Sequence, residues 1–205
     1  MICTYLETNF ILELAFAQEQ NDSCNKILEF AESGRIKIIL PAFSVGECFE
    51  TLVRRHKERK ALQNQINTQT NQLQRSFGYG QESQQLKDFN SLLIRINETD
   101  EERMDSILSR ILNVSEIIPL DKNVVQVANR YRKQFKLAYQ DSIVFASIIS
   151  HLNSFKQGES CFLNRNSSDF NDPDIHQALS DHDCKLLFRF DSGIQFILGH
   201  APLHP

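Results

Sequence analysis

Five polar side chains with oxygen atoms that could bind a metal lie at corresponding places along the chain. Each comes just after a short apolar segment or at the start of a helical pattern. They are Glu7, Glu47, Asp141, Asn166 and Asp169. If their segments are neighbours in the fold, the carboxylates repel one another unless a cation lies between them. Hard divalent cations such as Mg²⁺ and Mn²⁺ prefer oxygen ligands and can activate water for attack on a phosphate ester. The set therefore indicates a metal site for phosphodiester chemistry.

Each of these acids also has a structural explanation that needs no metal. Ser44 and Glu47 match the Ser-x-x-Glu pattern of a capping box. Asp141 could be the N-cap of the helix that follows it, and Glu7 could cap the helix after the first apolar segment. Asp169 could stabilise a turn. The arrangement of the whole set, rather than any one residue, favours the metal site.

The segments that would position these residues alternate between short apolar runs and helical patterns. The runs expected to be strands are 2–6, 36–40, 116–120, 160–163 and 184–190. They are short and do not alternate in polarity, which is typical of a parallel sheet covered by helices on both faces. The sequence therefore predicts an α/β fold, a three-layer α/β/α sandwich around a mostly parallel five-stranded sheet. Ligands bind such sheets beyond the carboxyl ends of the strands, where the acids are expected.

Local signals predict where several helices begin and end. Asp22 or Ser23 could cap a helix that Gly34 ends, and Asp121 could cap another. Pro173 is suited to the first turn of a short helix, because the N–H that proline lacks would be unpaired there.

A polar insertion separates the second expected strand from the third. It is rich in Gln, Asn, Lys and Glu and has only a thin apolar stripe, with the motif Phe77-Gly78-Tyr79-Gly80 near its middle. We expect two long helices at about 57–105 that form an arm inserted into a single domain spanning residues 1–205. The arm is a candidate surface for a protein partner or for a homodimer.

The composition limits the class of protein. There are 26 acidic residues against 22 lysines and arginines, a formal net charge of −4. That balance argues mildly against a high-affinity nucleic-acid binder, although a site built from carboxylates itself adds negative charge. The five cysteines are an odd number with no Cys-x-x-Cys spacing, which favours buried thiols in a reducing compartment. No apolar run reaches the roughly 18 residues needed to cross a bilayer, so we expect a cytoplasmic protein without a membrane segment.

Two basic clusters lie near the candidate acids in the sequence. The first contains Arg54, Arg55, Lys57, Arg59 and Lys60, and the second contains Arg130, Arg132, Lys133 and Lys136. In an acidic protein such clusters could guide a phosphate backbone to the site, while a solvated helix face would explain them without a ligand. The candidates for nucleic-acid contact are Arg54, Arg55, Lys57, Arg132 and Lys133.

Four segments resemble the PIN-domain family in their order and spacing. They are Tyr5-Leu6-Glu7-Thr8-Asn9, Leu40-Pro41-Ala42-Phe43-Ser44-Val45-Gly46-Glu47, Tyr139-Gln140-Asp141-Ser142-Ile143, and Phe162-Leu163-Asn164-Arg165-Asn166-Ser167-Ser168-Asp169-Phe170. The likeness covers the chain except the arm. It implies an α/β/α sandwich around a parallel sheet, and Mg²⁺- or Mn²⁺-dependent cleavage of RNA or, in some members, of structured DNA.

The resemblance also implies which residues hold the metal. Glu7, Glu47 and Asp141 match the family's first three acids, and Asn166 or Asp169 matches the fourth. Two positions depart from the usual pattern, because Glu7 and Asn166 stand where the family more often has Asp.

Further polar residues are expected around this set. Thr8 and Asn9 match positions that in the family often support the metal or the phosphate. Asn164 and Arg165 are additional candidates, and Arg165 could contact the scissile phosphate.

Three hypotheses about function follow. The leading one is a metal-dependent nuclease, most simply an endoribonuclease that hydrolyses phosphodiester bonds by metal-activated water. The second is a catalytically inactive PIN-like module that binds nucleic acid or a protein partner. The third is a toxin that an antitoxin protein neutralises. Titration with a divalent metal would separate the first two.

Overall fold

The computed structural model describes residues 1–155 and 158–200. Within them, the strands are β1 (Ile2–Tyr5), β2 (Ile36–Pro41), β3 (Ser115–Ile118), β4 (Ser160–Leu163) and β5 (Cys184–Leu187). The helices are α1 (Thr8–Ala15), α2 (Asn21–Glu32), α3 (Ala42–Leu73), α4 (Gly80–Val114), α5 (Lys122–Gln134), α6 (Tyr139–Ser154), α7 (Ser167–Phe170), α8 (Pro173–Ser180) and α9 (Phe190–His200).

The strands form one parallel sheet in the order β3-β2-β1-β4-β5. The central strand is β1, and its Tyr5 is in register with Ile39 of β2 on one side and with Phe162 of β4 on the other. Because these neighbours are parallel, the carboxyl ends of β1, β2 and β4 lie at the same edge of the sheet. The predicted α/β fold with a five-stranded parallel sheet is confirmed.

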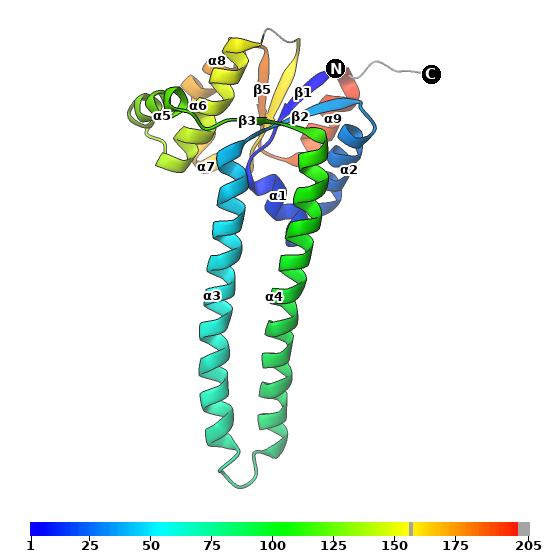
Figure 1. Ribbon diagram of the computed structural model, residues 1–205, viewed down its shortest axis with the longest axis vertical. Helices are drawn as coiled ribbons and strands as arrows, with labels where there is room; N and C mark the ends of the chain where they lie inside the picture. The colour runs from blue at the N-terminus through cyan, green and yellow to red at the C-terminus, as the bar shows by residue number, and fades with distance from the viewer. Residues whose placement is uncertain (156–157, 201–205) are drawn as a thin grey trace.

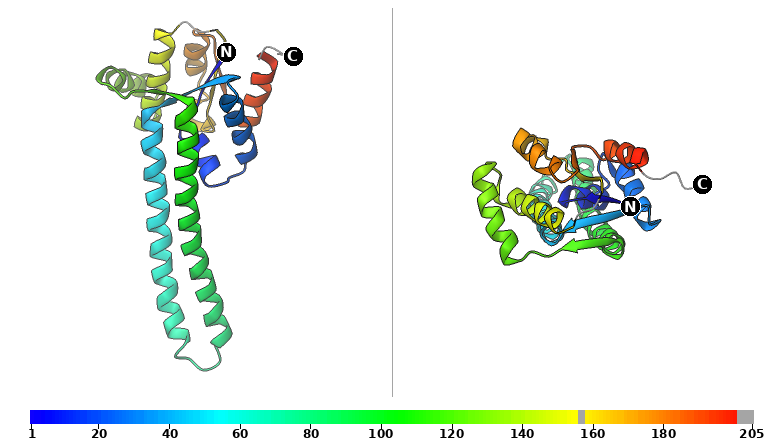
Figure 2. Two further views of the ribbon diagram at one scale, coloured as in Figure 1. Left: turned by 45° about the vertical axis from the view of Figure 1, so that its right-hand side comes forward. Right: turned by 90° about the horizontal axis from the view of Figure 1, so that it is seen from above.

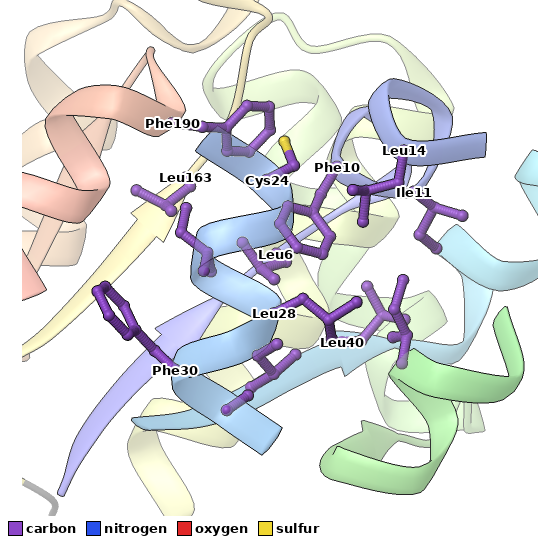
Figure 3. Packing of buried hydrophobic residues seen from close by; sticks show 14 of the residues in the cluster. Leu6, Phe10, Ile11, Leu14, Cys24, Leu28, Phe30, Leu40, Leu163 and Phe190 are labelled. Atoms are coloured by element: carbon purple, nitrogen blue, oxygen red, sulfur yellow. The ribbon is translucent and has the colours of Figure 1, made fainter. Parts of the chain in front are cut away.

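Buried strand side chains point alternately into two hydrophobic clusters, one on each face of the sheet. Ile38 and Leu40 belong to the cluster that α1, α2 and α9 cover, whereas Ile39 belongs to the cluster that α6 and α8 cover. Figure 3 shows Leu40 in the first cluster together with Phe10 of α1 and Leu28 of α2. The structure therefore has the three α/β/α layers that the sequence predicts.

Three of the predicted helix signals are confirmed. The Asp121 side chain accepts a hydrogen bond of 2.8 Å from the backbone N–H of Val124 and so caps α5. Pro173 lies at the first turn of α8. Gly34 follows α2 with a φ of +73°, a conformation that glycine adopts at little cost.

The predicted cap of α2 is wrong. The helix begins at Asn21, and Gln20 occupies the N-cap position without a side-chain capping bond. Asp22 and Ser23 therefore lie inside the helix. The Asp22 carboxylate in the first turn still suits the positive end of the helix dipole, which explains why this residue type occurs there.

The fifth strand is shorter than expected. It ends at Leu187, and Phe190 begins α9 rather than ending the strand. The backbone N–H of Phe190 donates to the side-chain oxygen of Gln20 at 2.8 Å, and its ring meets Phe10 edge-on with 5.5 Å between centroids. These contacts bury Phe190 in a helical conformation, although an apolar run alone is equally compatible with a strand.

The arm is a hairpin of α3 and α4, which lie side by side and extend away from the sheet (Figure 1, Figure 2). The helices contain 32 and 35 residues, so each is roughly 50 Å long at a rise of about 1.5 Å per residue. Their bases are part of the first core cluster through Cys48 and Leu52 of α3 and Met104 and Leu108 of α4. The helices therefore continue from the core into the arm without a break.

Beyond the core, α3 and α4 pack through a largely polar seam. Gln63, Thr70 and Ser83 are buried there, and the side-chain amide of Asn90 donates to that of Asn67 at 2.8 Å. A seam of this kind fits the thin apolar stripe seen in the sequence. In the described part of the chain, no helix combines the length and the apolar character needed to cross a membrane.

Candidate functional site

The parallel sheet brings the candidate acids to its carboxyl edge. Glu7 occupies the N-cap position of α1 directly after β1, and Glu47 lies near the start of α3 after β2. Asp141 lies in the first turn of α6, and Asp169 lies in α7, shortly after β4. The charges of Glu47 and Asp141 act on Glu7, and those of Asp169 and Glu47 act on Asp141. The four carboxylates therefore share one electrostatic environment.

Glu7 is the most deeply buried of these acids, with 6% of its surface exposed. Burial raises the pKa of Glu7 to about 8, the backbone and side-chain amide groups of Asn9 lower it, and the charges of Glu47 and Asp141 raise it again. Its Oε1 atom is buried without a hydrogen-bond partner. An unpaired buried carboxylate is costly, and a bound cation would remove that cost.

Asp141 is half-buried and linked to Asp169 through Asn166. Burial and the charge of Asp169 raise the pKa of Asp141 to about 6, the Asn166 amide lowers it, and Glu47 raises it slightly more. The Asn166 Nδ2 atom lies 2.7 Å from Asp169 Oδ2 and 3.5 Å from Asp141 Oδ1. Its carbonyl oxygen instead accepts a hydrogen bond of 2.8 Å from Ser168. In this structure Asn166 therefore donates to the acids rather than presenting a ligand oxygen with them.

Two of the predicted supporting residues have defined roles. The hydroxyl of the buried Thr8 donates a short hydrogen bond to Glu47 Oε2, which holds that carboxylate against the start of α1. The side-chain oxygen of the buried Asn164 accepts from the backbone N–H of Asn166 at 2.7 Å. That bond shapes the turn between β4 and α7, and thereby fixes where Asn166 lies.

The capping explanations for the acids are not supported. α3 begins at Ala42 with Pro41 at the N-cap position, so Ser44 lies inside the helix, and its buried hydroxyl has no partner. The prediction of a capping box formed by Ser44 and Glu47 is therefore wrong. α6 begins at Tyr139, which places Asp141 within the first turn and not at the cap. Glu7 occupies an N-cap position but makes no side-chain capping bond.

The acids do not form a closed ligand set. Among the described residues, no group of three or more His, Cys, Asp or Glu side chains is arranged to hold a metal ion. The donor set nevertheless fits a divalent cation. The charges of Glu47 and Asp141 raise the pKa of Glu7, and the buried Oε1 atom of Glu7 has no hydrogen-bond partner. Like-charge repulsion opposes the close approach that a bound ion would favour.

Arg165, the candidate for a phosphate contact, makes two ion pairs within the protein. Its guanidinium forms a close ion pair with the buried Glu13 and a second pair of 3.3 Å with Glu19. Glu13 also accepts a hydrogen bond of 2.8 Å from the backbone N–H of Gln20. Arg165 therefore ties the loop after β4 to the turn between α1 and α2.

The predicted basic clusters are only partly exposed. Arg54 and Lys57 lie exposed on α3, and Arg132 and Lys133 lie exposed in the last turn of α5, where cations suit the negative end of the helix dipole. Arg55 is instead half-buried, with its guanidinium 3.9 Å from the ring centroid of Phe16.

Two basic residues that the sequence analysis did not single out also lie near this cluster. Arg95 and Arg103 of α4 line a cavity together with Arg55 and Arg59 of α3. About 40 residues separate the two pairs in the chain, and only the pairing of the two helices brings them together. No local pattern could have revealed this group.

Comparison with protein families gives one match. The model of a family described as a PIN domain matches residues 4–170. The match spans β1 to α7 and therefore includes every candidate acid and Asn166. No curated protein and no solved structure matched the chain.

Proposed function

The chain belongs to the PIN-domain family, and on that basis we propose that it is a metal-dependent nuclease that hydrolyses RNA internally. PIN domains are generally nucleases. The observation that carries the proposal is the unpaired Oε1 atom of buried Glu7, which shares its environment with Glu47 and Asp141 at the carboxyl edge of the sheet. Burying an acid there destabilises the fold unless it binds something positive.

The residues proposed to hold the metal are Glu7, Glu47, Asp141 and Asp169. A bound Mg²⁺ or Mn²⁺ would supply charge neutralisation at the phosphate and activation of the attacking water. Thr8 orients the Glu47 carboxylate through its hydroxyl. Asn166 bridges Asp141 and Asp169, which keeps these two carboxylates from turning away from each other.

The backbone contributes as well. Glu7 is the N-cap of α1 and Asp141 lies in the first turn of α6, and the N-terminus of a helix carries partial positive charge. These helix ends favour ionised carboxylates and favour a phosphate group that approaches them. The arrangement requires no side-chain nucleophile.

The test compares two aspartates that occupy equivalent helix positions. Asp141 lies in the first turn of α6, and Asp174 lies exposed in the first turn of α8. We expect Asp141→Asn to lower cleavage of single-stranded and hairpin RNA in Mn²⁺ or Mg²⁺ by at least a hundredfold, because it removes a metal ligand. Asp174→Asn should leave cleavage unchanged, and EDTA should abolish cleavage by the unaltered protein. Activity that survives both EDTA and Asp141→Asn would exclude this function.

The second candidate is a module that binds nucleic acid or a protein without cleaving it. The donor orientation of Asn166 and the absence, among the described residues, of a closed ligand set favour it. Thermal melts with increasing Mn²⁺ separate the two candidates. A metal-induced rise in melting temperature that Asp141→Asn reduces supports the nuclease, whereas no rise and no cleavage of RNA or DNA supports the module.

A further inference from the structure

A second polar site lies where the arm joins the core. It is a cavity of about 450 Å³ between the end of α1 and one side of the α3–α4 hairpin. We call it the arginine cleft, because Arg55, Arg59, Arg95 and Arg103 line it. Phe16, Leu92 and Ile96 supply its apolar wall, and Asp100 is the acid among the lining residues.

The charge of the arginine cleft is poorly compensated. Arg59 lies 2.8 Å from Asp100 and also donates to Asn97 at 2.8 Å, so it is occupied within the protein. Within residues 1–155 and 158–200, no ion pair is found for Arg55, Arg95 or Arg103. Three arginines without an ion pair among the described residues therefore line one cavity, in a chain whose net charge is −4.

Burial and the neighbouring positive charges both lower the pKa of Arg55. Its pKa is lowered first by burial and then by the positive charge of Arg59, with Arg54 adding to the effect, while Asp100 and Glu58 act in the opposite direction. The charged form of Arg55 is thus destabilised in the free protein. An anion in the cleft would relieve that repulsion.

The walls of the cleft are suited to more than an isolated anion. The Arg55 guanidinium carbon lies over the Phe16 ring, 3.9 Å from its centroid, which is a cation–π contact. Leu92 is 40% exposed beside it. Flat cationic and apolar surfaces next to free guanidinium groups match an unstacked base joined to its phosphate. A duplex hides its bases and would not use the apolar wall.

The cleft lies on a path that leads from the candidate acids. Phe16 follows the last residue of α1, whose N-cap is Glu7, and Arg55 lies eight residues after Glu47 on α3. At a rise of about 1.5 Å per residue, both helices span roughly 12 Å between acid and cleft. Figure 1 shows α1 beside the upper part of the arm, which extends beyond the carboxyl ends of β1 and β2. A strand of a few nucleotides can reach from one site to the other.

We propose that the arginine cleft binds the phosphate backbone of single-stranded nucleic acid next to the bond that is cleaved. The inference rests on the proposed nuclease function for the position of that bond, but not for binding itself. Arg95 and Arg103 are the principal phosphate contacts, because the structure gives neither of them a protein partner among the described residues. The arm is therefore part of the substrate-binding surface.

The test measures binding of a fluorescent 12-nucleotide single-stranded RNA in EDTA, where metal-dependent cleavage is suppressed. The variants are Arg95→Ala, Arg103→Ala and the double substitution, and the matched control is Arg75→Ala, an exposed arginine near the tip of the arm. Each lost phosphate contact should weaken binding about fivefold at 0.1 M salt. It should also make the slope of the logarithm of the association constant against the logarithm of the salt concentration shallower by about 0.7. Arg75→Ala should change neither quantity.

Two further experiments distinguish the remaining outcomes. Thr99→Glu adds a negative charge to the cleft without removing an arginine, and it should weaken binding in the same way. Inorganic phosphate at the same concentration should compete poorly; competition as strong as that of unlabelled RNA would identify a free-phosphate site and overturn the proposal. Normal binding by folded double and Thr99→Glu variants, checked by thermal melts, would also overturn it.

Failure of this proposal and failure of the nuclease proposal give different results. Arginine-dependent binding without cleavage in Mn²⁺ contradicts the nuclease function and leaves the cleft in place. Metal-dependent cleavage with binding unchanged by the arginine substitutions contradicts the cleft and leaves the nuclease function in place.

Discussion

Glu7 and Asp169 show how differently the same chemical group is held within one candidate site. Glu7 follows a central strand and is 6% exposed, whereas Asp169 lies in a one-turn helix and is exposed to solvent. Asp169 also accepts a hydrogen bond from Asn166, whereas the Oε1 atom of Glu7 has no hydrogen-bond partner among the described residues. Folding raises the pKa of Glu7 by more than it raises that of Asp141.

The first prediction concerns the pH dependence of stability in the metal-free protein. The pKa of Glu7 is raised from 4.5 to about 8 by folding, and that of Asp141 from 3.8 to about 6. Between the unfolded and folded pKa values the native state holds protons that the unfolded state has lost, so stability decreases as pH rises. We expect the free energy of unfolding in EDTA, measured with urea, to fall from pH 5 to pH 8. The fall above pH 6 belongs mainly to Glu7.

Two variants and one ligand check this assignment. Glu7→Gln should flatten the profile between pH 6 and pH 8, whereas Glu82→Gln, an exposed glutamate in the first turn of α4, should keep it. Mg²⁺ should stabilise the protein more at pH 8 than at pH 6, because binding requires ionised carboxylates. Stability that stays level or rises from pH 6 to pH 8 in EDTA would contradict the burial of an unpaired acid.

The sequence predicted the types and positions of the acids but not their local partners. Glu7, Glu47 and Asp141 could be placed at one sheet edge because parallel strands end together. The capping explanations of Glu47 and Asp141 failed because the N-caps of α3 and α6 lie three residues earlier than the sequence motifs indicate. The ion pair of Arg165 with Glu13 could not be foreseen, since Glu13 lies in an apolar helix that gives no sign of a buried charge.

At the scale of elements, the loop that carries Asn166 and Asp169 depends on the packing of β4 against α9. Leu163 is the last residue of β4 and is fully buried. A Cβ atom on Gly193 of α9 would lie 2.6 Å from one methyl carbon of Leu163 and 2.8 Å from the other. The glycine therefore allows α9 to approach the strand directly before the loop begins.

The second prediction follows from this close approach. Gly193→Ala should destabilise the protein by about 2 kcal/mol, because the methyl groups of the fully buried Leu163 must shift within the core, and this loss exceeds the gain in helix propensity. For a chain of this length that corresponds to a decrease of roughly 4–8 °C in melting temperature. Gly199→Ala in the same helix meets no atom within 4 Å and serves as the control. Equal melting temperatures for the two variants would show that Leu163 repacks freely.

The elements themselves were largely predictable, and their boundaries were less so. Short apolar runs bounded by polar residues identified each of the five strands, because that pattern is typical of a strand buried on both faces. The same reasoning assigned Phe190 to β5, although the residue begins α9. An apolar residue is suited to either element, and its contact with Phe10 arises only once the fold exists.

At the scale of the whole molecule, the arm has two parts with different roles. Its base belongs to the core through Leu52 and Met104 and also forms the arginine cleft. Its outer part packs only through the seam between α3 and α4. The sequence showed that the arm is polar and helical, but the cleft depends on residues about 40 positions apart and could not be read from either helix alone.

The last prediction separates these two parts. Replacing residues 63–91 with a short glycine–serine linker removes the outer arm and keeps Leu52, Met104, Leu108 and every residue that lines the arginine cleft. Adjacent packed helices lie about 8–10 Å apart, a gap that a few linker residues can span. We expect the shortened protein to unfold cooperatively within about 5 °C of the full chain, because the buried residues Gln63, Thr70 and Ser83 that it loses belong to none of the hydrophobic core clusters.

Circular dichroism and thermal melts measure that outcome, and binding of single-stranded RNA measures its functional counterpart. Because the cleft is retained, the shortened protein should bind with an affinity close to that of the full chain and keep the same dependence on Arg103. Loss of cooperative unfolding would show that the polar seam stabilises the core, against the packing described above. Cooperative unfolding with much weaker binding would place the main phosphate contacts on the outer arm, where Arg75 and Lys87 are the exposed cations. The comparison thus decides whether the base of the arm or its outer part binds the nucleic acid.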